Sequence, residues 1–150
     1  MNTRLLGIDH GEKRIGLAIS DQLGSFAHPY RTLQADVHVI DQIRTIVRNE
    51  KIGKIVIGLP KNMDGTLGPS AAKAKSFSER LAQAIPDITI LLWDERLTTL
   101  EAQRVLHTAG KNTRQSKKMI DQVAAQILLQ NYMDSLQYDG SRTSETDRRI

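Results

Sequence analysis

The sequence predicts an α/β fold with a mixed central sheet, antiparallel at its N-terminal strands and parallel afterwards, flanked by helices. Two short apolar runs, Leu5–Asp9 and Ile15–Ser20, are separated by a turn that contains Gly11, a pattern typical of an antiparallel hairpin. Two later apolar runs, 54–59 and 88–93, each follow a segment with helical periodicity. Helices between strands favour right-handed crossovers, which make the joined strands parallel.

The elements of the first half follow in order from this pattern. After the hairpin we expect a third strand around Tyr30–Leu33 and then a helix from Asp36 to about Glu50, whose apolar residues recur on one face. The run Lys54–Leu59 is continuous, β-branched and stopped by Pro60. Such a run indicates a strand that is buried on both faces, central in the sheet and parallel to the first strand.

In the second half, turn residues fill 61–69 and a helix is expected over Pro69–Ala84. The run Ile88–Trp93 predicts another buried strand, which stops on Asp94 and Glu95. Because strands joined by right-handed crossovers run parallel, the ends of the first strand and of these two later strands should lie at one edge of the sheet. Open α/β sheets bind ligands at such an edge.

Two helical patterns close the chain. Thr98 and Glu101 form a capping box, which predicts a helix that ends at Gly110. The final helix is expected over about Lys117–Gln137 and should return across the sheet with one apolar face.

Length and composition bound the class of protein. The chain has 150 residues, 39% of them hydrophobic, enough for one core without cross-links. We therefore expect a single domain over 1–138 and a flexible polar tail over 139–150. With no cysteine, disulfides, thiolate metal sites and cysteine nucleophiles are excluded. No apolar run is long enough to span a bilayer, so we expect a cytoplasmic protein with no membrane partner.

The net charge of +4 favours a polyanionic partner such as nucleic acid, although many unrelated proteins carry as much. The positions of the charges in the sequence are more informative about such a partner than the net charge is. Lys111, Arg114, Lys117 and Lys118 crowd one polar segment, 110–118, between two helical patterns. Such a loop can follow a phosphate backbone.

Asp9 is the first candidate for a functional residue, because it places a charge at the tip of an apolar strand. Considered alone, it is better explained as a turn former, since Asp side chains bond nearby backbone amides. The alternative is that it binds a cation. Two other acids favour the alternative: Glu95 at the exit of a parallel strand and Asp121 on the last helix, beside small residues that permit close approach.

Each of these acids has a simpler explanation. Glu95 can be an exposed acid that pairs with Arg96, and Asp121 can be a favourable charge near a helix N-terminus. Together, however, clustered carboxylates repel one another unless they are protonated or bind divalent cations, and oxygen ligands favour Mg²⁺ or Mn²⁺. Two such ions stabilise the attacking and leaving oxygens of a phosphodiester displacement. The pattern therefore predicts a metal-dependent nuclease with two Mg²⁺ or Mn²⁺ ions.

Four motifs in order resemble those of the YqgF (RuvX-like) family of ribonuclease-H-like proteins. They are Gly7-Ile8-Asp9-His10-Gly11-Glu12-Lys13-Arg14-Ile15-Gly16, the loop from Gly58 to Thr66, Asp94-Glu95-Arg96-Leu97-Thr98-Thr99, and Lys118-Met119-Ile120-Asp121. Any one of them is weak evidence, whereas four in order over nearly the whole chain are specific.

The resemblance implies a ribonuclease-H-like fold in which Asp9, Glu95 and Asp121 are both the catalytic and the metal-binding residues. It also implies a role in trimming the 5′ end of precursor 16S ribosomal RNA, and the family has been described as Holliday junction resolvases. Gln122 stands where the family often has Ala, a change expected to be neutral. His10 either assists the metal site or only fills the turn, and we favour the turn.

Six cations are assigned to substrate binding: Lys13, Arg14, Arg96, Arg114, Lys117 and Lys118. For the two arginines next to the acids, contact with phosphate and pairing with a neighbouring carboxylate are equally consistent with the sequence. Trp93 is expected in the core and not as a platform for bases, and Asp64 is expected to form its loop.

Three functions remain open at this stage. The first is an endonuclease acting on precursor ribosomal RNA, and the second is a resolvase acting on branched DNA, which would need two active sites and hence a homodimer. The third is a catalytically silent module that binds nucleic acid. A silent module would be expected to lose its acids, and this chain keeps all of them.

Overall fold

The structure, a computed structural model, describes residues 4–60, 64–94 and 113–138, with side chains of the last helix described from 119 to 136. The elements in these ranges are β1 (Arg4–His10), β2 (Arg14–Ser20), β3 (Ala27–Gln34), α1 (Val39–Asn49), β4 (Ile52–Leu59), α2 (Pro69–Ala84), β5 (Thr89–Asp94) and α4 (Thr113–Tyr138). The helix predicted over 98–110 and the predicted tail 139–150 lie outside the described residues.

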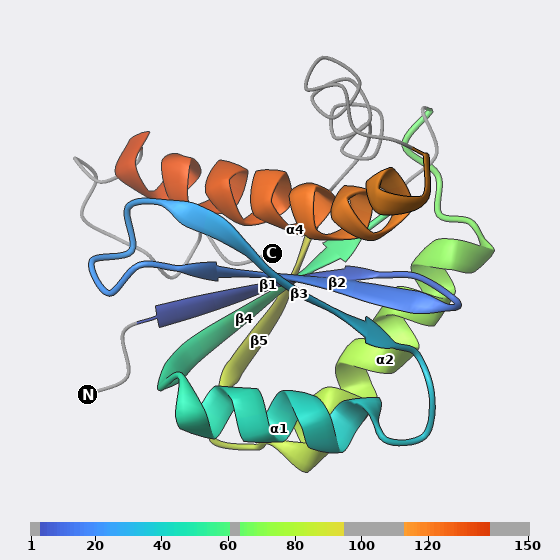
Figure 1. The fold of residues 1–150 in the computed structure, drawn as a ribbon, viewed down its shortest axis with the longest axis horizontal. Coiled ribbons are helices and arrows are strands. Elements are labelled where there is room, and N and C mark those ends of the chain that lie inside the picture. Colours follow the sequence, from blue (N-terminus) through green and yellow to red (C-terminus); the bar gives the residue numbers. More distant parts are fainter. Residues whose placement is uncertain (1–3, 61–63, 95–112, 139–150) are drawn as a thin grey trace.

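Five strands form one mixed sheet in the order β3-β2-β1-β4-β5 (Figure 1). β1, β2 and β3 pair antiparallel, as a meander requires, whereas β4 pairs parallel to β1 and β5 parallel to β4. The predicted fold class is therefore confirmed, including the central position of β4. As predicted, β1, β4 and β5 all end at the same edge of the sheet.

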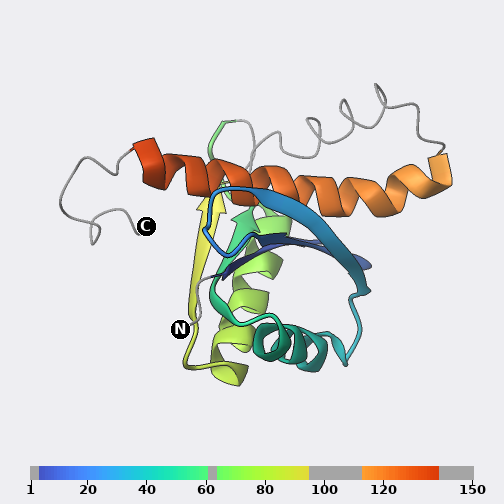
Figure 2. The same cartoon turned by 60° about the vertical axis from the view of Figure 1, so that its left-hand side comes forward.

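Helices cover both faces of the sheet, which makes three layers. α4 lies across one face and contacts β1, β2 and β3, while α1 and α2 lie on the other face (Figures 1 and 2). The predicted return of the last helix across the sheet is confirmed.

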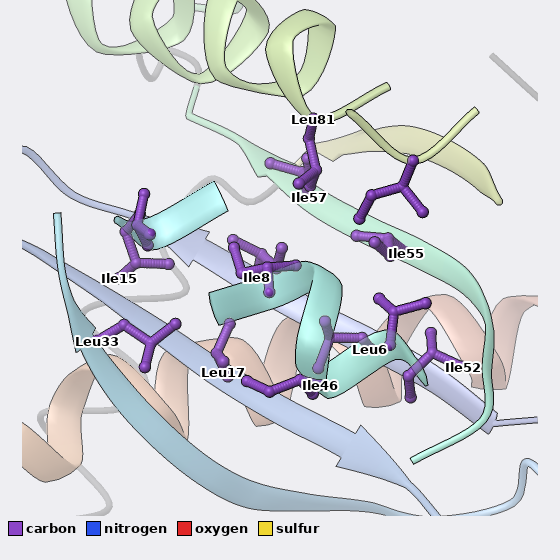
Figure 3. Close-up of a cluster of buried hydrophobic side chains, with 14 of the residues drawn as sticks. Leu6, Ile8, Ile15, Leu17, Leu33, Ile46, Ile52, Ile55, Ile57 and Leu81 are labelled. Carbon is purple, nitrogen blue, oxygen red and sulfur yellow. The ribbon is translucent and has the colours of Figure 1, made fainter. Parts of the chain in front are cut away.

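The larger part of the core lies between the sheet and the pair α1 and α2. Alternate residues of the strands point into it, and Leu6, Ile8, Ile15 and Leu17 are fully buried there (Figure 3). Full burial of one such side chain contributes about 1.5–3 kcal/mol relative to exposure. The neighbouring residues in each strand face α4, as Leu5 and Ala18 do. This alternation decides which side of the sheet each functional side chain occupies.

α4 packs unusually close to the sheet because glycines lie beneath it. A Cβ on Gly7 would lie 2.8 Å from the Cβ of Leu129, and one on Gly16 would lie 2.0 Å from the carbonyl oxygen of Asp121. Neither position can accept a side chain unless the helix moves. Small residues of the strands thus allow the close approach in addition to the small helix residues that the sequence suggested, Ala124 and Ala125, which are fully buried.

Several predicted boundaries are corrected. β3 is longer than the predicted 30–33 because it pairs with β2 along its whole length, and Pro29 is tolerated since β3 is an edge strand. α1 begins at Val39 and not at Asp36, because the Asp36 carboxylate accepts the His38 backbone N–H in a turn before the helix. β5 is only partly buried and is the last strand of the sheet within the described ranges, so its prediction as a buried strand was wrong.

Candidate active site at the end of β1

Asp9 is the penultimate residue of β1 and faces α4. Leu5 and Gly7, which alternate with Asp9 along β1 and point to the same side of the sheet, show this orientation. Leu5 packs into the cluster under α4, and Gly7 lies against Ala125 and Leu129. The next residue, His10, contacts Phe77 of α2 on the opposite face, with ring centroids 4.8 Å apart. Asp9 is half-buried and, as the penultimate residue of β1, lies at the edge of the sheet where the parallel strands end.

Asp121 reaches the same place from α4. In the sheet Asp9 pairs with Gly16 of β2, and the backbone of Asp121 lies directly over Gly16. Two acids separated by more than one hundred positions in sequence therefore lie beside the same glycine, on the same face of the sheet. This is the convergence that the sequence predicted for Asp9 and Asp121.

Arg14 completes this cluster. Its Nε donates a hydrogen bond to Oδ2 of Asp121 at 2.7 Å, and the exposed fractions of the two side chains are 36% and 17%. From the sequence, Arg14 was equally consistent with contacting phosphate and with pairing with an acid. In this structure Arg14 pairs with Asp121, an acid that the sequence did not suggest as its partner.

The position of Asp121 within α4 excludes its simpler explanation. α4 begins at Thr113, earlier than the predicted Lys117, so Asp121 lies more than two turns inside the helix. The favourable effect of a helix dipole on an acid is confined to the first turn. Asp121 is therefore not a helix-terminal charge.

The same early start changes the setting of three predicted substrate-binding residues. Arg114, Lys117 and Lys118 belong to the first turns of α4. Lys117 and Lys118 were predicted to begin this helix, whereas the prediction that Arg114 lies in a loop before it was wrong. Arg, Gln and Lys are good helix formers, which explains why this polar segment extends the helix. The orientation of their side chains lies outside the described residues.

Glu95 and Arg96, the remaining predicted residues of the acidic motif, also lie outside the described residues. The structure describes the residue before them, Asp94, which ends β5, is exposed and pairs in register with Leu59 of β4. Lys13 is exposed in the turn between β1 and β2, and its carbonyl accepts the backbone N–H of Ala35. Trp93 is only partly buried, but it packs against the core under α4 as expected, and its ring meets that of Tyr132 edge-on at 5.2 Å.

His10 is on the wrong side of the sheet to assist the acids. Burial lowers its pKa below the ordinary value, and the nearby charges of Arg80 and Lys73 lower it further. His10 therefore belongs to the α2 side of the sheet.

Asp64, as expected, forms its own loop. Its Oδ1 accepts a hydrogen bond from the backbone N–H of Thr66 at 3.0 Å and another from the Thr66 hydroxyl at 2.7 Å.

The described residues fit a hard divalent cation. Asp9 and Asp121 offer oxygen ligands only, and Mg²⁺ is commonly held by one or two carboxylates together with water and substrate phosphates. Within the described ranges no group of three or more His, Cys, Asp or Glu side chains could hold a metal. The third predicted ligand, Glu95, is not in those ranges.

The fold defines the class of protein. Two solved resolvases resemble the chain over most of their lengths: Thermus thermophilus RuvC bound to a Holliday junction substrate (TM-score 0.56, 10% identity, 91% of this chain and 96% of the other) and the fowlpox virus resolvase bound to Holliday junction DNA (TM-score 0.57, 12% identity, 89% and 98%). This likeness shows a ribonuclease-H-like fold.

Sequence comparison shows the family. The family model described as "RuvX: Holliday junction resolvase" matches residues 3–135, and the chain belongs to this nuclease family. The chain is 47% identical to a protein of Thermoanaerobacter pseudethanolicus over 88% of this chain and 96% of that one. It is 41% identical to a protein of Staphylococcus haemolyticus over 89% and 97%. Both relatives carry the name "Putative pre-16S rRNA nuclease".

Among the helices that the structure describes, none is long and apolar enough to cross a membrane.

Proposed function

We propose that this protein is a metal-dependent endonuclease that processes the 5′ end of precursor 16S ribosomal RNA in the cytoplasm. The observation that carries the proposal is the convergence of Asp9 and Asp121 beside Gly16, with Arg14 bound to Asp121. The names of the relatives from Thermoanaerobacter and Staphylococcus support the choice of substrate.

Asp9 and Asp121, together with Glu95, would hold two Mg²⁺ or Mn²⁺ ions. When bound, such ions activate water and stabilise charge on the oxygens of a phosphodiester displacement. The role of the fold is positional: β1 carries Asp9, Gly16 lets α4 approach, and α4 places Asp121 on the same face. Substrate phosphates would be held by Lys13, Arg96, Arg114, Lys117 and Lys118.

Arg14 has a second role in this proposal. Its hydrogen bond fixes the orientation of the Asp121 carboxylate, and its charge partly neutralises a site where acids would otherwise repel one another. A guanidinium has further N–H donors, so Arg14 can hold Asp121 and still donate to a substrate phosphate.

The experiment is a cleavage assay on a precursor 16S RNA fragment with Mg²⁺ or Mn²⁺. Asp9→Asn, Asp121→Asn and Glu95→Gln should each lower the rate by about 100-fold or more, because each removes a charged metal ligand. Asp41→Asn is the matched control, since Asp41 is an acid of α1 paired with Arg44. Equal cleavage by wild type and Asp9→Asn would overturn the proposed site.

A second candidate function is the resolution of branched DNA, which the description of the matched family favours. This function requires two active sites, so it predicts a homodimer in solution and symmetric cuts in a four-way junction. Light scattering with and without junction DNA tests it. A strict monomer that cuts RNA but leaves the junction intact would exclude it, and binding of both substrates without cleavage would indicate a catalytically silent module.

A further inference from the structure

A pocket lies on the face of the sheet opposite the acids, at the same end of β1. It has a volume of about 540 Å³ and is enclosed by the end of β1, the segment 35–39 and one side of α2. Asp9 and His10 are consecutive, yet Asp9 faces α4 and His10 lines this pocket. The pocket and the proposed catalytic site are therefore separate, because they lie on opposite faces of the sheet at the same end of β1.

The inner wall of the pocket is apolar and partly aromatic. Phe77 is 1% exposed and Val39 3%, and Ile15, labelled in Figure 3, is fully buried. The ring of His10 is half-buried and lines the space, and it contacts the buried ring of Phe77, so the aromatic surface that a ligand can reach here is chiefly that of His10. A flat, largely apolar group would replace water here with a favourable free energy.

The rim is polar, and its charges balance. Two cations, Lys73 and Arg80, line it together with two acids, Glu12 and Asp36. Lys73 forms an ion pair with Glu12, and the guanidinium carbon of Arg80 lies 5.7 Å from the centroid of the Phe77 ring. A polyphosphate would meet both carboxylates, whereas a neutral ring with donors and acceptors at its edge would find partners of both kinds.

We propose that this pocket binds a nucleobase. Its volume lies within the range of about 300–1,000 Å³ typical of ligand pockets, and single-stranded RNA is commonly recognised by placing an unstacked base on aromatic, His or Arg side chains. The choice of a base over other flat heterocycles rests on the proposed function. The base can come from a free nucleotide or from a nucleotide of a bound strand that has left its stack.

The first test is a titration with AMP, GMP, CMP and UMP, followed by amide NMR signals of the protein, with ribose 5-phosphate as the ligand that lacks a base. We expect at least one nucleotide to shift the signals of His10 and Ser76, and ribose 5-phosphate to leave them unchanged. Ser76 is an exposed pocket residue, so Ser76→Phe should fill the space and abolish the shifts. Ala82→Phe is the matched control, since Ala82 is exposed on α2 and does not line the pocket.

Equal shifts with ribose 5-phosphate would show an anion site and overturn the proposal, as would no shift with any nucleotide or unchanged binding by Ser76→Phe. The source of the base is decided by anisotropy with a single-stranded RNA 12-mer. A loss of about 10-fold in affinity for Ser76→Phe but not for Ala82→Phe indicates a base of the strand. Equal affinity, with nucleotide shifts retained in the wild type, indicates a free nucleotide. Because Asp9→Asn lacks cleavage but keeps the pocket, it should bind nucleotides normally, which separates this test from that of the nuclease site.

Discussion

At the scale of single residues, the ion pair between Arg14 and Asp121 gives a mostly buried acid beside Asp9 a partner of opposite charge. The Asp121 side chain is 17% exposed, so its charge is only partly solvated. Arg14 supplies the compensating charge at 2.7 Å, and Arg14 and Gly16 belong to the same strand, β2. One strand therefore provides both the space and the counter-charge for Asp121.

Replacing Arg14 tests this role. Arg14→Ala should lower the free energy of unfolding by about 1 kcal/mol, because the pair is only partly buried, and should also lower the rate of RNA cleavage. Arg14→Lys keeps the charge but not the planar fork, so it should retain most of the stability and less of the activity. Urea unfolding and cleavage assays measure the two effects. In a double-mutant cycle with Asp121→Ala, a coupling energy of zero would contradict a stabilising pair.

Asp21 has a structural role at the opposite end of the sheet, in the turn between β2 and β3. Its Oδ1 accepts the backbone N–H of Ser25 at 2.8 Å, and the backbone N–H of Phe26 approaches the same oxygen at 3.4 Å. These hydrogen bonds, chiefly that of Ser25, lower the pKa of Asp21. The carboxylate form is therefore stabilised in the folded state.

The pH dependence of stability follows from this sign. A group whose pKa is lower in the folded protein stabilises above its unfolded value, about 3.9 for Asp, and that contribution is lost as pH falls through the folded pKa. Asp21→Asn resembles the protonated form, so its melting temperature should lie below that of the wild type at pH 7 and converge with it in acid. Asp87→Asn, at an exposed acid before β5, is the control. A gap that persists unchanged in strong acid would contradict the linkage.

At the scale of elements, the contact between α4 and the sheet positions Asp121, one of the two described acids. Gly7 and Gly16 set the closeness of the helix, and glutamines fix its rotation. Gln130 accepts the backbone N–H of Ala27 at 2.8 Å, and Gln126 donates to the Ala27 carbonyl at 3.0 Å. Gln122, expected to be neutral, donates to the hydroxyl of Thr32 at 3.1 Å. The apolar periodicity predicted the helix but not this polar row, because hydrogen bonds to a strand edge leave no periodic hydrophobic signal.

Gly16→Ala should disturb stability and activity together. Its Cβ would overlap the carbonyl of Asp121, which is backbone and cannot rotate away, so α4 must shift. We expect a loss of about 1–3 kcal/mol in the free energy of unfolding and a fall in cleavage, since Asp121 moves with the helix. Gln34→Ala, at an exposed residue of β3, is the control for urea unfolding. A variant with wild-type stability and activity would mean that α4 does not pack on Gly16.

At the scale of the whole molecule, the sequence was sufficient for the topology and for the two described acids. Turn residues and continuous apolar runs predict the meander and the parallel strands, and crossover handedness then brings Asp9 to the edge where the parallel strands end. The partner of Arg14 and the separation of His10 from Asp9 could not be predicted with the same certainty. The first depends on the rotation of α4. The second depends on the length of β1, which extends through His10 although the sequence pattern placed His10 in the turn, so the alternation of the strand puts His10 on the face opposite Asp9.

The stability of the whole chain should increase when divalent metal is added, and this increase should depend on Asp9. With Mn²⁺ at 100 times its dissociation constant, the wild type should gain about 2.7 kcal/mol for each ion bound, whereas Asp9→Asn should gain much less. Melting temperatures in EDTA and in Mn²⁺, at matched ionic strength, measure both. Asp41→Asn should respond as the wild type does. An Asp9→Asn variant stabilised by Mn²⁺ as much as the wild type would show that the cation binds elsewhere, and the nuclease proposal would lose its metal site.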